Sequence, residues 1–170
     1  MVKKCFISLL IVSLVSCVSY RIANEKVITT YMDNGNVKYY IRPSKLTSDE
    51  KADAYAMLDI TYQKRNRAYV SPGFVNFTLQ VSTSAFVRSA QFILPEEQVI
   101  SLTDISTLDR NAVKGFIRVS TTVAQESMAL LLERLQATEA VLEVVMDDDA
   151  VYRFTVSQEL TDKLAEAFEK

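Results

Sequence analysis

The chain has 170 residues, 49% of them hydrophobic, and a formal charge of −2, which is compatible with one domain that has a real core. Histidine is absent, which excludes histidine general bases, histidine-containing metal sites and a histidine pH switch. The 19 basic and 21 acidic residues leave no basic excess of the kind that predicts nucleic-acid binding. Only three glycines occur, too few for a phosphate-binding glycine loop. We therefore expect no cofactor, no metal site and no nucleic-acid partner.

The N-terminus has the pattern of a secretory signal. Lys3 and Lys4 are followed by an apolar run over residues 6–15, and then by Ser16 and Cys17. A basic segment, a short apolar segment and a small residue before a cleavage point are typical of such signals. The apolar run is too short for a transmembrane helix, which needs roughly 20 apolar residues.

The residues that end this run, Leu14-Val15-Ser16-Cys17, resemble the lipobox of bacterial lipoproteins. The resemblance implies that Cys17 receives a diacylglyceryl group on its sulfur and that the chain is cut just before it. Residues 1–16 would then be the signal peptide. An ordinary cleaved signal with an accidental cysteine and an uncleaved anchor are the alternatives.

The resemblance also implies a location. Acyl chains on Cys17 would hold the mature protein in a membrane of the cell envelope, because two or more such chains anchor stably. The next residue is Val18 rather than aspartate, which in the enterobacterial version of this system favours the outer membrane over the inner one. We expect residues 17–26 to form the lipidated cysteine and a tether, and residues 27–170 to form a single β-rich globular domain.

The first predicted element of that domain is a β-hairpin over residues 27–32 and 37–41. Asn34-Gly35 at its tip is a strong signal for a two-residue turn, because both residue types tolerate a positive φ. Such a turn pairs Met32 with Val37. Pro43 is expected to end the second strand.

Alternating apolar residues predict further strands over residues 52–63 and 73–82, with a loop over 64–72 between them. Residues 86–94 and 99–102 follow as strands around a turn at 95–97. Residues 103–111 look irregular, with room for a single helical turn, and 115–121 predict another strand.

Two helices and one hairpin complete the pattern. Thr122 is expected to cap a helix over 123–137, and Ser157 to cap the last helix. A hairpin over 140–146 and 151–156 fits a three-residue loop, with an aspartate in the left-handed conformation. The apolar residues of the helices lie at helical spacing: Met128, Leu131, Leu132 and Leu135 in the first, and Leu160, Leu164 and Phe168 in the second. The predicted fold is α+β, a mostly antiparallel sheet or sandwich of about seven to nine strands with two helices near the C-terminus.

Two charged segments are candidate ion sites. The run Asp147-Asp148-Asp149 suggests calcium, but it lacks the glycine and the following glutamate of a calcium loop, and a solvated hairpin tip is the favoured interpretation. The basic segment Lys64-Arg65-Asn66-Arg67 could contact lipid phosphates or another anion, although a solvated loop is again favoured.

Two further features were weighed as sites. Ser48 and Lys51 match the S-x-x-K nucleophile motif of penicillin-binding enzymes, but the companion motifs are missing and the chain is too short for that fold. Tyr31 and Tyr40 point away from the predicted core, where they form either a contact surface or a covered second face of the sheet. We favour the covered face, while Tyr39 is predicted to lie in the core.

Two classes of function remain open at this point. The first is a non-catalytic, membrane-anchored lipoprotein of the cell envelope that binds a partner protein or supports an envelope assembly. The alternative is a small periplasmic enzyme that uses carboxylate, serine and lysine chemistry. The missing histidine and glycine-rich loops favour the first class, and Cys17, as the lipidation site, is the one functional residue that we predict.

Overall fold

The structure is a computed structural model that describes residues 25–48, 50–51, 53–81 and 85–169. The predicted signal peptide, Cys17 and most of the predicted tether lie outside these residues. Among the helices of the described ranges, none is long and apolar enough to span a membrane.

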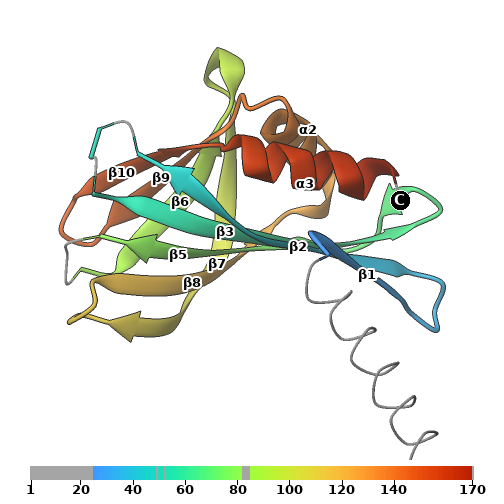
Figure 1. The fold of residues 1–170 in the computed structure, drawn as a ribbon, viewed down its shortest axis with the longest axis horizontal. Helices are drawn as coiled ribbons and strands as arrows, with labels where there is room; N and C mark the ends of the chain where they lie inside the picture. Colours follow the sequence, from blue (N-terminus) through green and yellow to red (C-terminus); the bar gives the residue numbers. More distant parts are fainter. Residues whose placement is uncertain (1–24, 49, 52, 82–84, 170) are drawn as a thin grey trace, which may run out of the picture.

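The fold is a single antiparallel sheet that closes on itself (Figure 1). Its ten strands follow the order β1-β2-β10-β9-β6-β7-β8-β5-β3-β4, and an additional pairing of β2 with β3 closes eight of them into a barrel. The strands are β1 (Val27–Tyr31), β2 (Val37–Thr47), β3 (Tyr55–Arg65), β4 (Ala68–Tyr69), β5 (Gly73–Gln80), β6 (Val87–Ile93), β7 (Val99–Asn111), β8 (Phe116–Val123), β9 (Val141–Met146) and β10 (Val151–Thr155). The predicted class, mostly antiparallel β with two late helices, is confirmed, while closure of the sheet was not predicted.

The barrel interior is built by the period-two pattern of the strands. On β5, Val75, Phe77 and Leu79 are buried, while Asn76 and Thr78 between them are partly exposed. Inward side chains of neighbouring strands meet in register, since Phe77 pairs with Leu58 of β3 on one side and with Val119 of β8 on the other. A strand with one buried face needs this alternation, which explains why the strand predicted over residues 73–82 is found over Gly73–Gln80; residue 82 lies outside the described residues.

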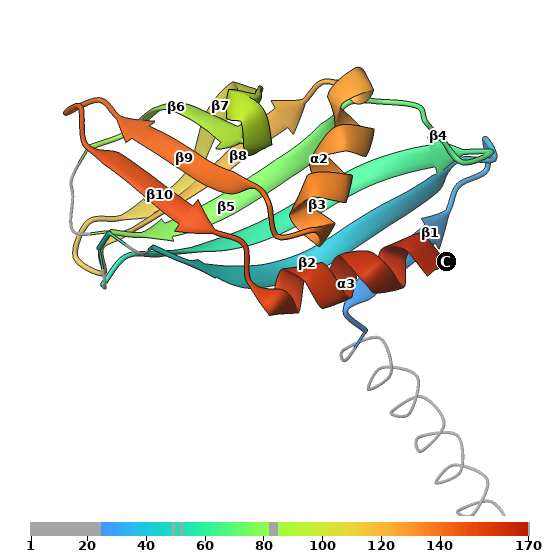
Figure 2. The ribbon, with the colours of Figure 1, turned by 90° about the horizontal axis from the view of Figure 1, so that it is seen from above.

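Two α-helices cover the same side of the strands (Figures 1 and 2). They are α2 (Met128–Gln136), preceded by the 3₁₀ turn η2 (Gln125–Ser127), and α3 (Gln158–Glu169); a further turn, η1 (Pro95–Glu97), lies between β6 and β7. The four apolar residues predicted for the first helix are all fully buried. Gly73 permits the close approach of α2, because a Cβ atom there would lie 2.3 Å from the sulfur of Met128.

The start of the first helix was predicted wrongly. Thr122 belongs to β8, where it pairs with Phe74, and the α-helix begins at Met128. The β-branched run Thr121-Thr122-Val123 fits an extended strand better than a helical turn. Ser157 directly precedes α3, and its carbonyl accepts hydrogen bonds from the amides of Leu160 and Thr161. The predicted side-chain cap does not form, because the buried Ser157 hydroxyl has no hydrogen-bond partner among the described residues.

The first hairpin forms, but its register differs from the prediction by one residue. Tyr31, not Met32, pairs with Val37. Gly35 adopts a φ of 78° while Asn34 does not adopt a positive φ, so the loop has three residues and ends in a left-handed glycine. The sequence signal located the turn correctly, but the predicted two-residue turn was wrong.

Pro43 does not end β2, because it lies at a β-bulge. Ile41 pairs with Ile60 of β3, whereas Ser44 pairs with Leu58, so three steps on β2 match two steps on β3. A proline can lie at a bulge because no ladder hydrogen bond from its nitrogen is needed there.

Lys163 of α3 satisfies carbonyl groups at this bulge. Its side chain is only 7% exposed, and its ammonium group donates to the carbonyl oxygen of Pro43 at 2.7 Å and to that of Arg42 at 3.4 Å. It also pairs with the Glu159 carboxylate at 2.7 Å. Before the bulge β2 pairs with β1, and after it β2 pairs with β10. Lys163 therefore connects α3 to the part of β2 between these two pairings.

Residues 103–111 continue β7 as a strand, contrary to the prediction of irregular chain. The pairing with β8 shifts register twice, between Thr103 and Ser106 and between Thr107 and Asp109. Most side chains of this half of β7 are exposed. The sequence therefore lacks the regular alternation of apolar and polar residues that identifies a half-buried strand.

The β9–β10 hairpin was predicted with its register. Leu142 pairs with Phe154 and Val144 with Tyr152, so the four side chains share the buried face. Asp149 takes a φ of 64° at the end of the three-residue loop, as predicted. An odd loop length was the only one that kept both apolar sets on one side.

Candidate functional site

A cavity of about 430 Å³ lies where the start of β2, the β3–β4 hairpin and the C-terminal end of α3 meet. Figures 1 and 2 both place the end of α3 beside that hairpin. We call this cavity the Lys64 pocket. It is lined by Val37, Tyr39, Lys64, Asn66, Arg67, Phe168 and Glu169.

Aromatic rings surround the ammonium group of Lys64. Its nitrogen lies 5.0 Å from the ring centroids of Tyr69 and Phe168, 5.4 Å from that of Tyr62 and 5.7 Å from that of Tyr39. Each distance is within the roughly 6 Å range of a cation–π interaction. Burial lowers the pKa of Lys64, because the aromatic surroundings replace water around the charged form.

The aromatic wall is continuous with the barrel core. Tyr39 and Tyr62 stack with centroids 5.0 Å apart and an interplanar angle of 12°, and Tyr69 packs against Tyr62 at 5.6 Å. Burial raises the pKa of Tyr62 and Tyr69, since it disfavours the phenolate form. The buried Tyr62 hydroxyl has no hydrogen-bond partner in the described part of the chain.

The β3–β4 turn places two basic side chains differently. Asn66 and Arg67 are consecutive left-handed residues with φ values of 49° and 69°, as in a type I′ hairpin turn. Arg65 reaches back to the first hairpin, donating to the Asn36 side-chain oxygen at 2.8 Å and to the Asn34 carbonyl at 3.0 Å. Arg65 therefore joins the two hairpins, while Arg67 lines the pocket.

The two pocket cations have no anionic partner among the described residues. No hydrogen bond or ion pair within those ranges involves the Lys64 ammonium or the Arg67 guanidinium group. Glu169 is the acidic residue of the lining. The last turn of α3 carries no basic residue, so Lys64 is also the cation placed near the negative end of that helix.

The sequence pointed to this region without defining the pocket. The segment from Lys64 to Arg67 was favoured as a solvated loop, whereas it forms a tight hairpin with two of its side chains held in specific contacts. Tyr62 and Tyr69 flank the segment, and these two tyrosines beside a basic segment were the sequence feature that could have indicated an aromatic environment for Lys64. Tyr39 and Phe168 come from distant parts of the chain, and only the barrel geometry brings them together.

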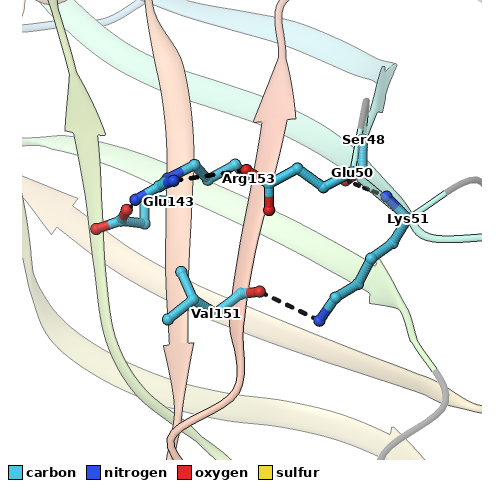
Figure 3. Close-up of polar contacts among 6 residues, drawn as sticks. All are labelled: Ser48, Glu50, Lys51, Glu143, Val151 and Arg153. Carbon is cyan, nitrogen blue, oxygen red and sulfur yellow. Dashed lines mark hydrogen bonds and ion pairs between the residues drawn. The ribbon is translucent and has the colours of Figure 1, made fainter.

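Ser48 and Lys51 are not arranged as a nucleophile and its base (Figure 3). The Lys51 ammonium donates to the Val151 carbonyl at 3.2 Å and lies 3.8 Å from the centroid of the Tyr152 ring. The Ser48 hydroxyl instead accepts the backbone amide of Lys51 at 3.3 Å. Ser48 is only 8% exposed, so it belongs to a local turn and not to an open cleft.

A neighbouring polar network links β6, β9 and β10, and Figure 3 shows its part between Glu143 of β9 and Arg153 of β10. Arg153 donates to the Glu143 carboxylate at 2.8 Å and approaches that of Glu50 at 3.5 Å. Gln91 of β6 adds a hydrogen bond to Glu143 at 2.8 Å. The pKa of Arg153 is raised mainly by its hydrogen bond to Glu143. These bonds satisfy a largely buried carboxylate and leave it engaged.

A second buried carboxylate, Asp59 of β3, is satisfied in the same way. It is 1% exposed and accepts hydrogen bonds from Asn76 at 2.7 Å and from Arg118 at 3.0 Å. Arg118 also reaches Thr78. The hydroxyl of Tyr40 lies in this neighbourhood, and its pKa is raised by burial and then by the charge of Asp59.

The acidic hairpin tip uses its carboxylates in local bonds. Asp147 accepts the amide of Phe86 at 3.0 Å, Asp148 accepts that of Ala150 at 3.1 Å, and Asp149 pairs with Arg88 at 2.6 Å. Across the residues that the structure describes, no group of three or more acidic or thiol side chains is placed to hold a metal ion.

The outward tyrosines do not share one environment. Tyr39 is in the core, as predicted. Tyr40 is partly buried, but Tyr31 is 81% exposed, so the expectation that both lie under a cover is wrong for Tyr31. Tyr31 is the last residue of β1.

Comparison with known proteins found no family model, no curated protein and no solved structure that matches this chain. The function is therefore argued from the N-terminal sequence and from the geometry of the Lys64 pocket.

Proposed function

We propose that this protein is a lipid-anchored protein of the bacterial cell envelope that acts by binding and not by catalysis. The anchor is the acylated Cys17, with residues 1–16 as the signal peptide, and the outer membrane is the favoured location because Val18 follows the cysteine. A protein of the envelope or an envelope assembly is the expected partner.

The observation that carries the binding role is the Lys64 pocket. It combines aromatic walls with two cations that have no anionic partner among the described residues, and such mixed apolar and polar cavities are typical of binding sites. The separation of Lys51 from Ser48 supports the same choice, because the lysine cannot act as the serine's base while it is bonded to Val151.

The anchor is tested by metabolic labelling with a fatty acid in a bacterial host. Cys17→Ser should abolish the label and leave the protein as unprocessed precursor or in the soluble fraction. Cys5→Ser is the matched control, because this cysteine leaves with the signal peptide and its loss should change nothing. Labelling that survives Cys17→Ser would contradict the proposed anchor.

The binding role is tested by cross-linking on intact cells, followed by purification from membranes. We expect one envelope component to co-purify with the anchored protein and with Ser48→Ala. If Ser48→Ala abolished complementation of a deletion strain while the protein stayed folded, the proposal of a non-catalytic role would fail.

A further inference from the structure

We propose that the Lys64 pocket binds an organic phosphate, with the phosphate group between Lys64 and Arg67 and the organic part against the rings of Tyr39 and Phe168. This inference rests on the proposed binding function and adds a small-molecule ligand of the Lys64 pocket to the protein partner expected there. The phosphate can belong to a lipid headgroup or to a soluble ester, and the experiment below separates the two sources.

The two cations supply the recognition of the phosphate. Among the described residues, the interactions of the Lys64 ammonium are with aromatic faces, which attract its charge but accept none of its N–H groups as an oxygen would. Its three donors therefore remain available for phosphate oxygens. Arg67 adds a planar guanidinium group with a fork of donors that matches phosphate geometry.

The size of the cavity indicates more than an inorganic ion. A volume of about 430 Å³ falls within the range of small-molecule sites, roughly 300–1,000 Å³, and greatly exceeds the volume of a phosphate group alone. Phe168 is 40% exposed, so a flat or aliphatic group can cover apolar surface that now faces water, and the largely buried Tyr39 also contributes to the lining.

The acidic group of the pocket restricts how the ligand lies. Glu169 and the negative end of α3 disfavour an anion on the α3 side. The phosphate must therefore lie on the hairpin side, near Arg67, and a hydroxyl or amine of the ligand can face Glu169. With two cations against one carboxylate, the lining keeps a net positive charge in an otherwise acidic protein.

Arg67 also has a left-handed backbone at the second position of the type I′ turn, a position that usually holds glycine. Glycine would therefore relieve the backbone strain that arginine has there. Glu96, Glu97 and Thr138 adopt the same conformation, so the cavity and its two cations, and not this strain, indicate the ligand.

The test uses the purified full chain in a non-ionic detergent and follows binding by NMR and calorimetry. The probes are phenyl phosphate, its two halves phenol and inorganic phosphate, and the short-chain lipid dihexanoyl-phosphatidylglycerol. We expect at least one of the two organic phosphates to bind more tightly than either half, and to shift the amide signals of Asn66 and Arg67.

Two variants remove the cations in different ways. Lys64→Met and Arg67→Gly should each weaken binding by about tenfold or more, the effect expected for a lost charge-assisted hydrogen bond. Arg67→Gly should keep or raise the melting temperature, because glycine adopts the left-handed conformation without strain. Lys38→Met is the matched control, since Lys38 is an exposed lysine of β2 outside the lining, and it should bind as the wild type does.

Each result decides the matter. Binding of the lipid alone assigns a headgroup, binding of phenyl phosphate alone assigns a soluble ester, and binding of both supports the shared chemistry. The proposal is overturned if neither organic phosphate binds, or if Lys64→Met and Arg67→Gly bind as tightly as the wild type. If binding fails in this way, fatty-acid labelling of Cys17 would still support the proposed lipid anchor. Hydrolysis of phenyl phosphate would contradict the non-catalytic function but would still support the Lys64 pocket as an organic phosphate site.

Discussion

Replacement of Lys163 by methionine should destabilise the protein by disconnecting α3 from the bulge of β2. Methionine keeps the apolar stem of the side chain and removes the ammonium group, so packing changes little. The lost contacts are the bonds to the carbonyl oxygens of Pro43 at 2.7 Å and Arg42 at 3.4 Å, and the ion pair with Glu159.

The size of the loss follows from the burial of these groups. A hydrogen bond from a charged donor contributes about 1.5–3 kcal/mol, and the short bond to Pro43 should fall in that range. The longer bond to Arg42 adds little, and the pair with the exposed Glu159 contributes about 0.3–0.5 kcal/mol. Removal of a buried ammonium also recovers part of its desolvation cost, so we expect a net loss of about 2–3 kcal/mol.

The assay is urea unfolding followed by circular dichroism, with thermal melting beside it. For a chain of this size the loss corresponds to a fall in melting temperature of about 5–10 °C. The m-value, the slope of the unfolding free energy against urea concentration, should not change. Lys51→Met is the matched control, because Lys51 also donates to a backbone carbonyl but at an exposed site, and it should cost about 1 kcal/mol or less. If Lys163→Met stays within about 0.5 kcal/mol of the wild type, the bulge does not depend on this lysine and the reasoning is wrong.

Tyr62→Phe should keep or raise the free energy of unfolding by about 1 kcal/mol, because it removes a buried hydroxyl that has no partner among the described residues. Burial raises the pKa of Tyr62, so above about pH 10 the unfolded chain loses the phenol proton before the folded chain does, and the free energy of unfolding of the wild type falls. Urea titrations at pH 8 and pH 11 should show a smaller fall for Tyr62→Phe than for the wild type. An equal fall would contradict this role of Tyr62. Leu131→Ala should cost about 2–5 kcal/mol in the same assay, whereas Ser48→Ala should cost about 1 kcal/mol or less, the loss of one turn hydrogen bond; a larger loss from the serine would reverse that order. Gly73→Ala should lower the melting temperature by several degrees through its contact with Met128, and a melting temperature equal to that of the wild type would show that α2 can move away.

The elements that could be predicted from sequence are those whose signal is local. The β9–β10 hairpin was predicted with its register because its apolar residues allow only one loop length. The first hairpin was located but misregistered by one residue, since asparagine-glycine is compatible with more than one turn and the choice depends on the sign of φ at Asn34.

The features that sequence could not reveal depend on contacts between distant residues. Closure of the barrel needs β2 to pair with β3 along its whole length and with β10 at its end, which no local pattern encodes. Lys64 was recognised as part of a basic segment, but its place among aromatic rings depends on Tyr39 and Phe168, more than a hundred residues apart in the chain. The pocket is therefore a product of the fold and not of a motif.

The junction of β2 with β10 has a consequence for the order in which the protein opens. Among the described residues it consists of a single pair, Thr155 with Thr47, reinforced by the Thr155 hydroxyl on the Thr47 carbonyl. Every other junction around the barrel is longer, so separation here costs least; it would open the barrel and expose the edge of β10 and the end of β2, while the start of β2 stays paired with β1. Since β10 leads directly into α3, the contacts of Lys163 with β2 also hold β10 close to β2. Loss of these contacts should speed amide exchange in β10 and promote self-association before the rest of the barrel unfolds.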